Sequence, residues 1–330
     1  MKAIALDCMG GDYAPTAIIE GAVQAAREFR QTLLLVGDEA KIQLELQKQD
    51  TRNLSIEIVP TTEVITFDDA PALAVRRKKD SSMVVAHRLV KEGRAAAVFS
   101  AGNTGAIMAC GLFVLGRMEG VERPALAPML PTAAKTPVLL LDAGANTEAK
   151  PQHLLQYGQM GSVYMRHVTG KEKPRVGLIN IGTEPEKGTP LYQETYQLLS
   201  QSDLNFVGNV EARELFLGDI DVAVCDGFTG NIILKLTEGL AKNFGEMIKQ
   251  ELTSDFRGTL GALLAKPSLT RFKSRLDYRE YGAAPLLGVQ GICLKGHGSS
   301  NARAIYSALR VAKEFVDSQL IAEFTEKMKS

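Results

Sequence analysis

The sequence of 330 residues lacks net charge, closely spaced cysteines and long hydrophobic runs. Lysine and arginine together number 38, as do aspartate and glutamate, so no overall field attracts the chain to nucleic acid. The four cysteines form no C-x-x-C pair and have no histidine at ligand spacing, so we expect free, buried thiols and no metal site. No run approaches the ~18 apolar residues of a membrane-spanning helix, and the apolar start is too short for a signal peptide. A cytoplasmic protein is therefore expected.

Six short apolar runs, rich in β-branched residues, are each followed by a loop of glycine and small polar residues. The runs are residues 3–6, 95–99, 138–141, 176–179, 222–224 and 289–294. Continuous apolar runs are typical of buried parallel strands, and open parallel sheets bind ligands just beyond the carboxyl ends of their strands. The sequence therefore predicts a polar pocket built from these six loops.

Segments with helical periodicity lie between the strands, at residues 15–29, 70–92, 191–200, 231–252 and 302–328. This alternation predicts an α/β fold with helices on both faces of a mainly parallel sheet, organised as a single catalytic unit over residues 1–330. Because each loop precedes a helix, free backbone N–H groups face the pocket and favour an anion. We expect Asp7, Asp142 and Asp226 to act as turn or cap acceptors, and Asp12 to cap the helix at Pro15.

Nucleotide motifs are absent from these loops. No G-x-G-x-x-G follows the first strand, and the loop around Lys187 has the wrong spacing for a Walker A motif. A single glycine in such a turn usually serves the backbone, but six similar loops together favour a ligand, and phosphate suits them. No cofactor is predicted. The polar and cationic side chains that these loops offer are Ser100, Asn103, Thr104, Asn146, Asn180, Lys187, Asn231, Lys295, His297, Ser299 and Ser300.

Together the six loops resemble those of the PlsX family of bacterial phosphate acyltransferases, from the first residues to about Ala304. The matching segments are residues 7–15, 100–106, 141–146, 180–188, 225–231 and 295–300. The resemblance implies a homodimer with a fold related to isocitrate and isopropylmalate dehydrogenases and to phosphotransacetylase. It also implies that the enzyme makes acyl phosphate and free acyl carrier protein (ACP) from acyl-ACP and inorganic phosphate, for phospholipid synthesis. A membrane glycerol-phosphate acyltransferase would then take the acyl phosphate. One departure is Cys8, where the family more often has alanine.

The residues agree with this chemistry, because phosphate can attack a thioester carbonyl without a protein nucleophile. The site must neutralise the anion and stabilise the developing oxyanion. We assign the first task to Lys187 and the second to Asn231, which lie in motifs that the resemblance also indicates. Further donors and backbone groups would complete the phosphate and substrate site, namely Gly10, Gly11, Asp12, Ser100, Asn103, Thr104, Asn146, His297 and Ser299.

Residues 253–281 break the alternation and are predicted to form an amphipathic helical hairpin interrupted at Pro267. Its apolar stripe lies beside basic residues; these positions are Phe256, Leu260, Leu263, Leu264, Leu269, Phe272 and Leu276 with Arg271, Lys273, Arg275 and Arg279. Such a segment can bind an anionic membrane or an acidic carrier protein, or it can form a dimer contact. The resemblance favours a membrane-touching hairpin, and hence peripheral membrane association.

Three other functions remain open at this stage. A decarboxylating dehydrogenase of the same fold would need acidic metal ligands and arginines, and the pocket loops contain few arginines. A phosphotransacetylase-like enzyme would use acyl-CoA in place of acyl-ACP. A non-catalytic phosphate or nucleotide sensor would bind without turnover. The preferred acyl length, the ACP-docking residues and any role of Cys8 and Cys225 are not determined by the sequence.

Overall fold

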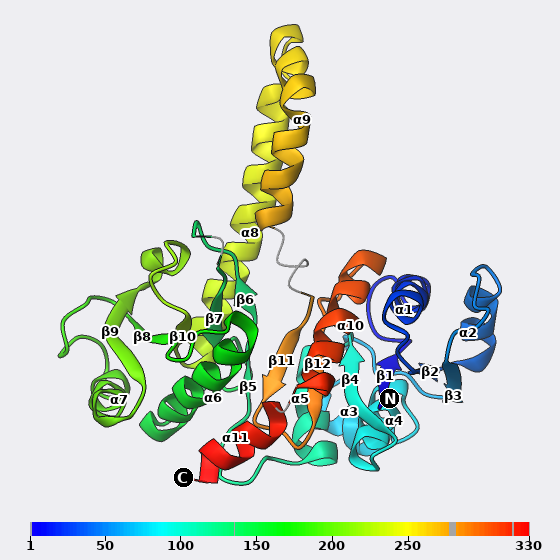
Figure 1. Ribbon diagram of the computed structural model, residues 1–330, viewed down its shortest axis with the longest axis horizontal. Coiled ribbons are helices and arrows are strands. Elements are labelled where there is room, and N and C mark those ends of the chain that lie inside the picture. The colour runs from blue at the N-terminus through cyan, green and yellow to red at the C-terminus, as the bar shows by residue number, and fades with distance from the viewer. Residues whose placement is uncertain (1, 135, 277–281, 319, 330) are drawn as a thin grey trace.

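The computed structural model describes residues 2–134, 136–276, 282–318 and 320–329, and it contains a larger and a smaller β-sheet (Figure 1). The strands of the larger sheet are, in spatial order, β3 (Ile56–Pro60), β2 (Leu33–Gly37), β1 (Ala3–Asp7), β4 (Ala95–Ser100), β12 (Ile292–Lys295), β11 (Ala284–Leu287) and β5 (Ala125–Leu126). The first five are parallel to one another, whereas β11 is antiparallel to both β12 and β5.

The smaller sheet is again mainly parallel. Its strands, in spatial order, are β6 (Met129–Leu130), β7 (Val138–Leu141), β10 (Val222–Val224), β8 (Arg175–Asn180) and β9 (Asn205–Glu211). Only β6 pairs in the antiparallel sense. The sheets meet where β5, at the edge of the larger one, leads into β6.

Helices cover both faces of each sheet. The shorter ones are α1 (Thr16–Phe29), α2 (Glu39–Leu46), α3 (Pro71–Arg77), α4 (Ser82–Lys91), α5 (Thr104–Cys110), the π-helix η1 (Gly111–Leu115), α6 (Pro151–Thr169), α7 (Pro190–Gln201), the 3₁₀ helix η2 (Ala212–Phe216), α10 (Ala302–Asp317) and α11 (Leu320–Lys329). Alternate strand residues face opposite sides, so Leu6 belongs to a core that also contains residues of α1, α6 and α10, while Ala5 belongs to a second core with residues of α4 and α5. Because the first of these cores also contains Leu141 of β7, it extends across both sheets.

These observations confirm the predicted α/β fold class, and each of the six apolar runs gives rise to a strand, although in the run 289–294 the strand begins only at Ile292. The strands divide between two sheets, and two predicted helices are each split, residues 70–92 into α3 and α4 and residues 302–328 into α10 and α11. The prediction that Asp12 caps the first helix is wrong. Pro15 occupies the N-cap position without a side-chain hydrogen bond, and the Asp12 N–H donates to the carbonyl of Gly298, 2.8 Å away.

A helical hairpin, formed by α8 (Gly227–Leu252) and α9 (Phe256–Leu276), projects from the body of the molecule (Figure 1). The predicted hairpin of residues 253–281 therefore covers only the turn and one arm, because the other arm is the outer part of α8. Pro267 does not interrupt the segment but lies inside α9. Residues 277–281, including Arg279, lie outside the described residues. Within the described chain, none of the helices combines the length and the apolar character needed to cross a membrane.

Candidate active site

The six predicted loops gather at the carboxyl ends of neighbouring parallel strands. In the larger sheet β4 lies between β1 and β12, and Ser100 pairs with Lys295 at the strand ends. In the smaller sheet β10 lies between β7 and β8, and Val224 pairs with both Leu141 and Leu178. We call the loops after β1, β4 and β12 the larger-sheet loops, and those after β7, β8 and β10 the smaller-sheet loops.

Asp7 connects two of the larger-sheet loops. Its buried carboxylate accepts hydrogen bonds from the Ser100 hydroxyl at 2.7 Å and from the Met9 N–H at 3.2 Å. The Ser100 oxygen in turn accepts from the Gly102 N–H at 3.1 Å. Burial raises the pKa of Asp7, while hydrogen bonds from Ser82 and Ser100 oppose that rise. The predicted substrate-binding residue Ser100 therefore also holds the loop backbone in place.

The loops after β1 and β12 contact each other through their backbones. Gly11 has a φ of +110°, and a Cβ there would lie 3.2 Å from the carbonyl oxygen of Gly298. A Cβ on Gly10 would lie 2.6 Å from the Asp7 carboxylate, so glycine is required for this close approach. The structure thus brings Gly10, Gly11 and Asp12 next to the loop that carries His297 and Ser299.

Asn103 and Thr104 begin α5, in the loop after β4. The Asn103 Oδ1 accepts from the Ala106 N–H at 3.1 Å, which caps the helix. Its Nδ2 lies 3.2 to 3.3 Å from carbonyl oxygens in the segment 66–69. The Asn103 side chain is therefore engaged within the protein, whereas Thr104 is half-buried at the first helical position. Their roles toward a ligand stay predictions.

His297 and Ser299 form a compact turn after β12. The Nδ1 atom of His297 accepts the Ser299 N–H at 3.1 Å and lies 2.9 Å from the Ser299 hydroxyl. Its Nε2 atom lies 4.0 Å from the carboxylate of Glu238 on α8. Burial, followed by the charge of Lys295, lowers the pKa of His297, so the neutral ring is favoured near pH 7.

Asp142 organises the first of the smaller-sheet loops. Its buried carboxylate accepts from the backbone N–H groups of Leu126, Gly144, Ala145 and Asn146 at 2.7 to 3.2 Å. It also accepts from the Asn146 amide at 3.0 Å, and that amide donates to the Pro124 carbonyl at 2.7 Å. Asn146, predicted to bind substrate, thus uses its amide to shape the loop. Burial raises the pKa of Asp142.

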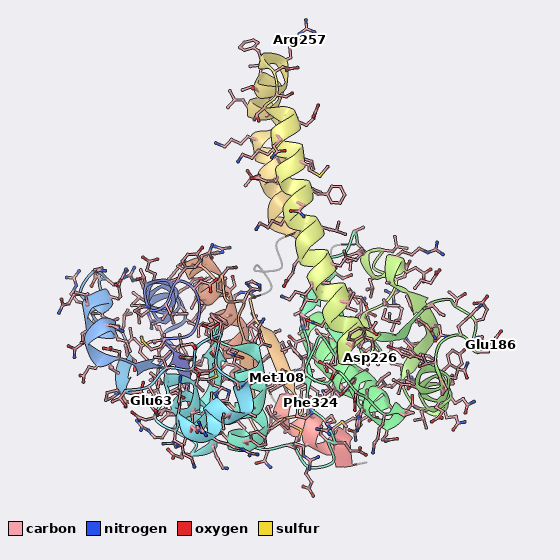
Figure 2. The ribbon with its side chains drawn as sticks, turned by 180° about the vertical axis from the view of Figure 1, so that it is seen from behind. Glu63, Met108, Glu186, Asp226, Arg257 and Phe324 are labelled. Carbon is pink, nitrogen blue, oxygen red and sulfur yellow. The ribbon has the colours of Figure 1, made fainter. Side chains whose placement is uncertain are left out.

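The N-terminus of α8 packs closely against this loop. Asp226 caps the helix by accepting from the Thr229 N–H at 3.0 Å, and Figure 2 shows Asp226 at the body end of α8. A Cβ on Gly230 would lie only 1.8 Å from the carbonyl oxygen of Asp142. Asn231 follows and lies over Gly144, where a Cβ would come within 3.3 Å of the Asn231 Cβ. The exposed Asn231 side chain is therefore held at a fixed place.

The loop after β8 holds Lys187 by its backbone and leaves the residue exposed. The Asn180 amide donates to the Lys187 carbonyl at 3.0 Å, and the Asn209 amide donates to the Glu184 carbonyl at 2.7 Å. The aliphatic part of the Lys187 side chain packs over Gly182, where a Cβ would lie 3.2 Å from its Cγ. The ammonium group is thus carried on a fixed loop and remains accessible to a ligand.

Tyr192 of α7 connects the two segments that carry Lys187 and Asn231. Its hydroxyl donates to the Asp226 carboxylate at the start of α8. Its Cβ lies beside Gly188, where an added Cβ would be 3.0 Å away. Burial, followed by this hydrogen bond, raises the pKa of Tyr192. The sequence analysis missed Tyr192, because a tyrosine within a helix carries no local signal for a partner 34 residues away.

The cysteines are buried and free, as predicted. Burial raises the pKa of Cys8 and of Cys225 well above the usual range, so their reactive thiolate forms are disfavoured near pH 7. Over the described residues, no group of three or more histidine, cysteine, aspartate or glutamate residues is arranged to hold a metal ion.

The chain is similar to known proteins over nearly its whole length. The family described as "Fatty acid synthesis protein" matches residues 2–323. A phosphate acyltransferase of Desulforamulus reducens is 53% identical over 330 residues, covering 100% of this chain and 98% of that protein. A phosphate acyltransferase of Alkaliphilus oremlandii is 50% identical over 327 residues, covering 99% and 97%.

Solved structures share the fold at low sequence identity. A phosphotransacetylase from Streptococcus pyogenes has a TM-score of 0.63 at 15% identity, covering 100% of this chain and 95% of that chain. A 4-hydroxythreonine-4-phosphate dehydrogenase from Klebsiella pneumoniae has a TM-score of 0.54 at 15% identity, with coverage of 96% and 100%. These likenesses agree with the predicted relation to the isocitrate dehydrogenase type of fold.

Proposed function

The chain belongs to the PlsX family and is a phosphate acyltransferase, and we propose that its acyl donor is a fatty acyl group carried by ACP. The observation that carries this proposal is the similarity, over the full chain, to phosphate acyltransferases of a family described by fatty acid synthesis. A phosphate oxygen attacks the thioester carbonyl carbon, and the C–S bond breaks as the tetrahedral intermediate collapses. The proton of HPO₄²⁻ ends on the thiol of ACP, so the products are acyl phosphate and free ACP.

Lys187 and Asn231 are the proposed catalytic side chains. Lys187 neutralises the phosphate, which otherwise repels the charge that develops on the carbonyl oxygen. Asn231 donates to that oxygen or orients the thioester, because its amide stands exposed at the start of α8. The larger-sheet loops supply backbone N–H groups and hydroxyls around the phosphate, which supports near-attack positioning without a covalent enzyme intermediate.

Acyl transfer should be measured as phosphate-dependent loss of a long acyl chain from acyl-ACP, with the acyl phosphate trapped by hydroxylamine and acyl-CoA assayed in parallel. We expect turnover with acyl-ACP, and a fall of at least about a hundredfold in kcat for Lys187→Ala and Asn231→Ala, the usual scale for one oxyanion donor. Lys41→Met, on the exposed face of α2, is the matched control. Near-normal turnover of both folded variants would disprove the assignment.

The same assay separates the competing functions. Turnover of acyl-CoA alone would indicate an enzyme of the phosphotransacetylase type. Tight phosphate binding without turnover of either thioester would indicate a sensor.

The hairpin supports a membrane-bound enzyme, because its tip is apolar and basic. Phe256 is 82% exposed, Leu264 77% and Leu263 65%, and Figure 2 shows Arg257 at the same end. We propose that this tip binds an anionic membrane, where a glycerol-phosphate acyltransferase receives the acyl phosphate. Farther from the tip, α8 exposes the apolar residues Leu236, Leu240 and Phe244. This exposed apolar surface supports pairing with a second copy in a homodimer.

Vesicle binding tests the role of the tip. Replacing Leu263 and Leu264 by glutamate should release the enzyme from vesicles that contain anionic lipid, because buried apolar area and charge attraction are both reduced. Leu44→Glu places the same charge at an exposed leucine of α2 and should leave binding unchanged. Equal sedimentation of the tip variant and the wild type with the vesicles would exclude the proposed contact.

A further inference from the structure

A hollow lies at the base of the hairpin, between the larger-sheet loops and α8. Its lining combines apolar residues, here called the apolar wall, with charged or titratable ones: Leu126, Pro128, Met129 and Leu234 with Glu238, Lys295 and His297. It encloses about 550 Å³ of space that includes open solvent. Leu126 ends β5, Met129 begins β6 and Pro128 lies between them, where the two sheets meet, so the hollow is a joint feature of both halves of the molecule.

Lys295, the last residue of β12, is the unusual group in this hollow. It is half-buried, and throughout the part of the chain that the structure describes its ammonium group has no hydrogen-bond or ion-pair partner. Glu238 is the nearby carboxylate, but it lies 3.0 Å from the ammonium of Lys235 on the same helix. Burial, followed by the charge of Lys235, lowers the pKa of Lys295 to about 8. The positive charge around Lys295 is therefore under-compensated.

The hollow adjoins the candidate catalytic groups. Asn231, Lys235 and Glu238 are separated by four and three residues, so they lie on one face of α8. That face meets the loop after β12, because Glu238 approaches His297 to 4.0 Å. Lys295 is also the register partner of Ser100, at the strand ends where two of the proposed phosphate-binding loops begin. A ligand in the hollow can therefore contact both sheets, and Asn231 lies about two helical turns from Glu238 on the same face of α8.

The apolar wall and the ammonium group of Lys295 together suit a molecule with an anionic head and an apolar tail. A bare phosphate would leave Leu126, Pro128 and Met129 without a role, whereas a simple fatty chain would leave the cation unpaired. We propose that Lys295 binds the phosphoryl group, first of substrate phosphate and then of the acyl phosphate product, while the apolar wall receives the first methylenes of the acyl chain. The assignment to the acyl phosphate rests on the proposed function, whereas the assignment to phosphate does not.

Lys295→Met keeps the length of the side chain and removes its charge. We expect the KM for phosphate to rise at least tenfold at saturating acyl donor, and the increase in Tm caused by inorganic phosphate to be lost. Lys41→Met, an exposed lysine on α2, should match the wild type in both measurements. A KM and a phosphate-induced shift within twofold of the wild type would overturn the proposal.

The thermal shift needs no acyl donor, so it tests Lys295 even if the wild type proves inactive toward acyl-ACP. In that case the proposed activity toward acyl-ACP is disproved, while the phosphate site is still tested by the thermal shift. Lys295→Arg restores the charge and should recover part of the phosphate-induced shift that Lys295→Met loses. Failure of the arginine variant to bind better than the methionine variant would also count against a charge-based role.

The pH dependence provides a readout that a purely structural role would not change. With a pKa of about 8, Lys295 loses its proton above that pH, so the wild-type KM for phosphate should rise between pH 8 and 10. The charged groups that face it, Lys235 and Glu238 on α8 and His297 on its own loop, remain in Lys295→Met. The methionine variant should therefore show a flat profile over this range, and a rise as steep as that of the wild type would contradict the proposal.

Discussion

In both the larger-sheet and the smaller-sheet loops, a buried aspartate lies at the carboxyl end of a parallel strand. Asp7 follows Leu6 as the last residue of β1, and Asp142 follows Leu141 at the end of β7. Burial raises the pKa of both carboxyl groups, and hydrogen bonds from nearby donors oppose that rise. Each carboxylate thus organises the turns around it from the inside, although the two belong to different sheets.

The two sets of loops differ in what they expose. The larger-sheet loops present mainly backbone, since Gly10 and Gly11 allow close approach and Asn103 is engaged within the protein. The smaller-sheet loops, with the start of α8, present the exposed residues Lys187 and Asn231. We propose from this difference a division of tasks, in which one half would form a rigid cradle for an anion and the other would supply the side chains for chemistry. Substitutions that affect stability or turnover selectively can test this division.

The largest expected effect is at Gly230, where the smaller-sheet loops are packed most tightly. An alanine Cβ would lie 1.8 Å from the Asp142 carbonyl oxygen, so α8 must move away from the loop. We expect Gly230→Ala to reduce the free energy of unfolding by more than about 3 kcal/mol, measured by urea denaturation. Gly245→Ala, on the same helix with open space around its Cβ, should be neutral or stabilise by up to about 1 kcal/mol. Equal effects of the two substitutions would show that this close contact does not constrain the site.

The elements that the sequence predicted correctly are those set by local pattern. Buried parallel strands need continuous apolar runs, so β7 and β10 coincide with the predicted residues 138–141 and 222–224. The hairpin was misplaced because periodicity locates a helix but does not determine which neighbour it packs against. The division of 70–92 into two helices was also not predicted, although the polar residues 78–81 separate the two apolar stretches and Ser81 caps α4.

The candidate site was predictable to the extent that its residues lie within the loops themselves. Lys187 lies in a loop of unusual composition and Asn231 lies in the first turns of α8, at the end of another such segment. The expected acceptor roles of Asp7, Asp142 and Asp226 are confirmed. The contacts between loops were not predictable, because the Asp12–Gly298 hydrogen bond joins residues far apart in the sequence. The substrate-binding and catalytic roles of the predicted site residues stay predictions.

A smaller effect is expected from Ser100→Ala in the larger-sheet loops. The change removes a 2.7 Å hydrogen bond to a buried carboxylate, which should reduce the free energy of unfolding by about 1 to 3 kcal/mol near pH 7. Burial already raises the folded-state pKa of Asp7, and loss of the Ser100 hydrogen bond raises it further. Ionising Asp7 therefore costs the folded variant more free energy than it costs the folded wild type. The reduction in the free energy of unfolding should therefore be small near pH 4 and grow as the pH rises toward 7. Urea unfolding at both pH values measures it, and a loss that shrinks with rising pH would contradict this account.

The smallest change in stability is expected for Tyr192→Phe, which removes one partly buried hydroxyl. The free energy of unfolding should fall by about 1 kcal/mol, because Asp226 keeps its hydrogen bonds from the N–H and hydroxyl of Thr229. We nevertheless expect kcat to fall about tenfold with little change in the KM for phosphate, since Tyr192 connects the Lys187 loop to the helix of Asn231. Tyr196→Phe, on the same helix and packed against Phe206, is the matched control. If Tyr192→Phe and Tyr196→Phe had the same kcat, the smaller-sheet loops would not need this connection for chemistry, and the proposed division of tasks would rest on Lys187 and Asn231 alone.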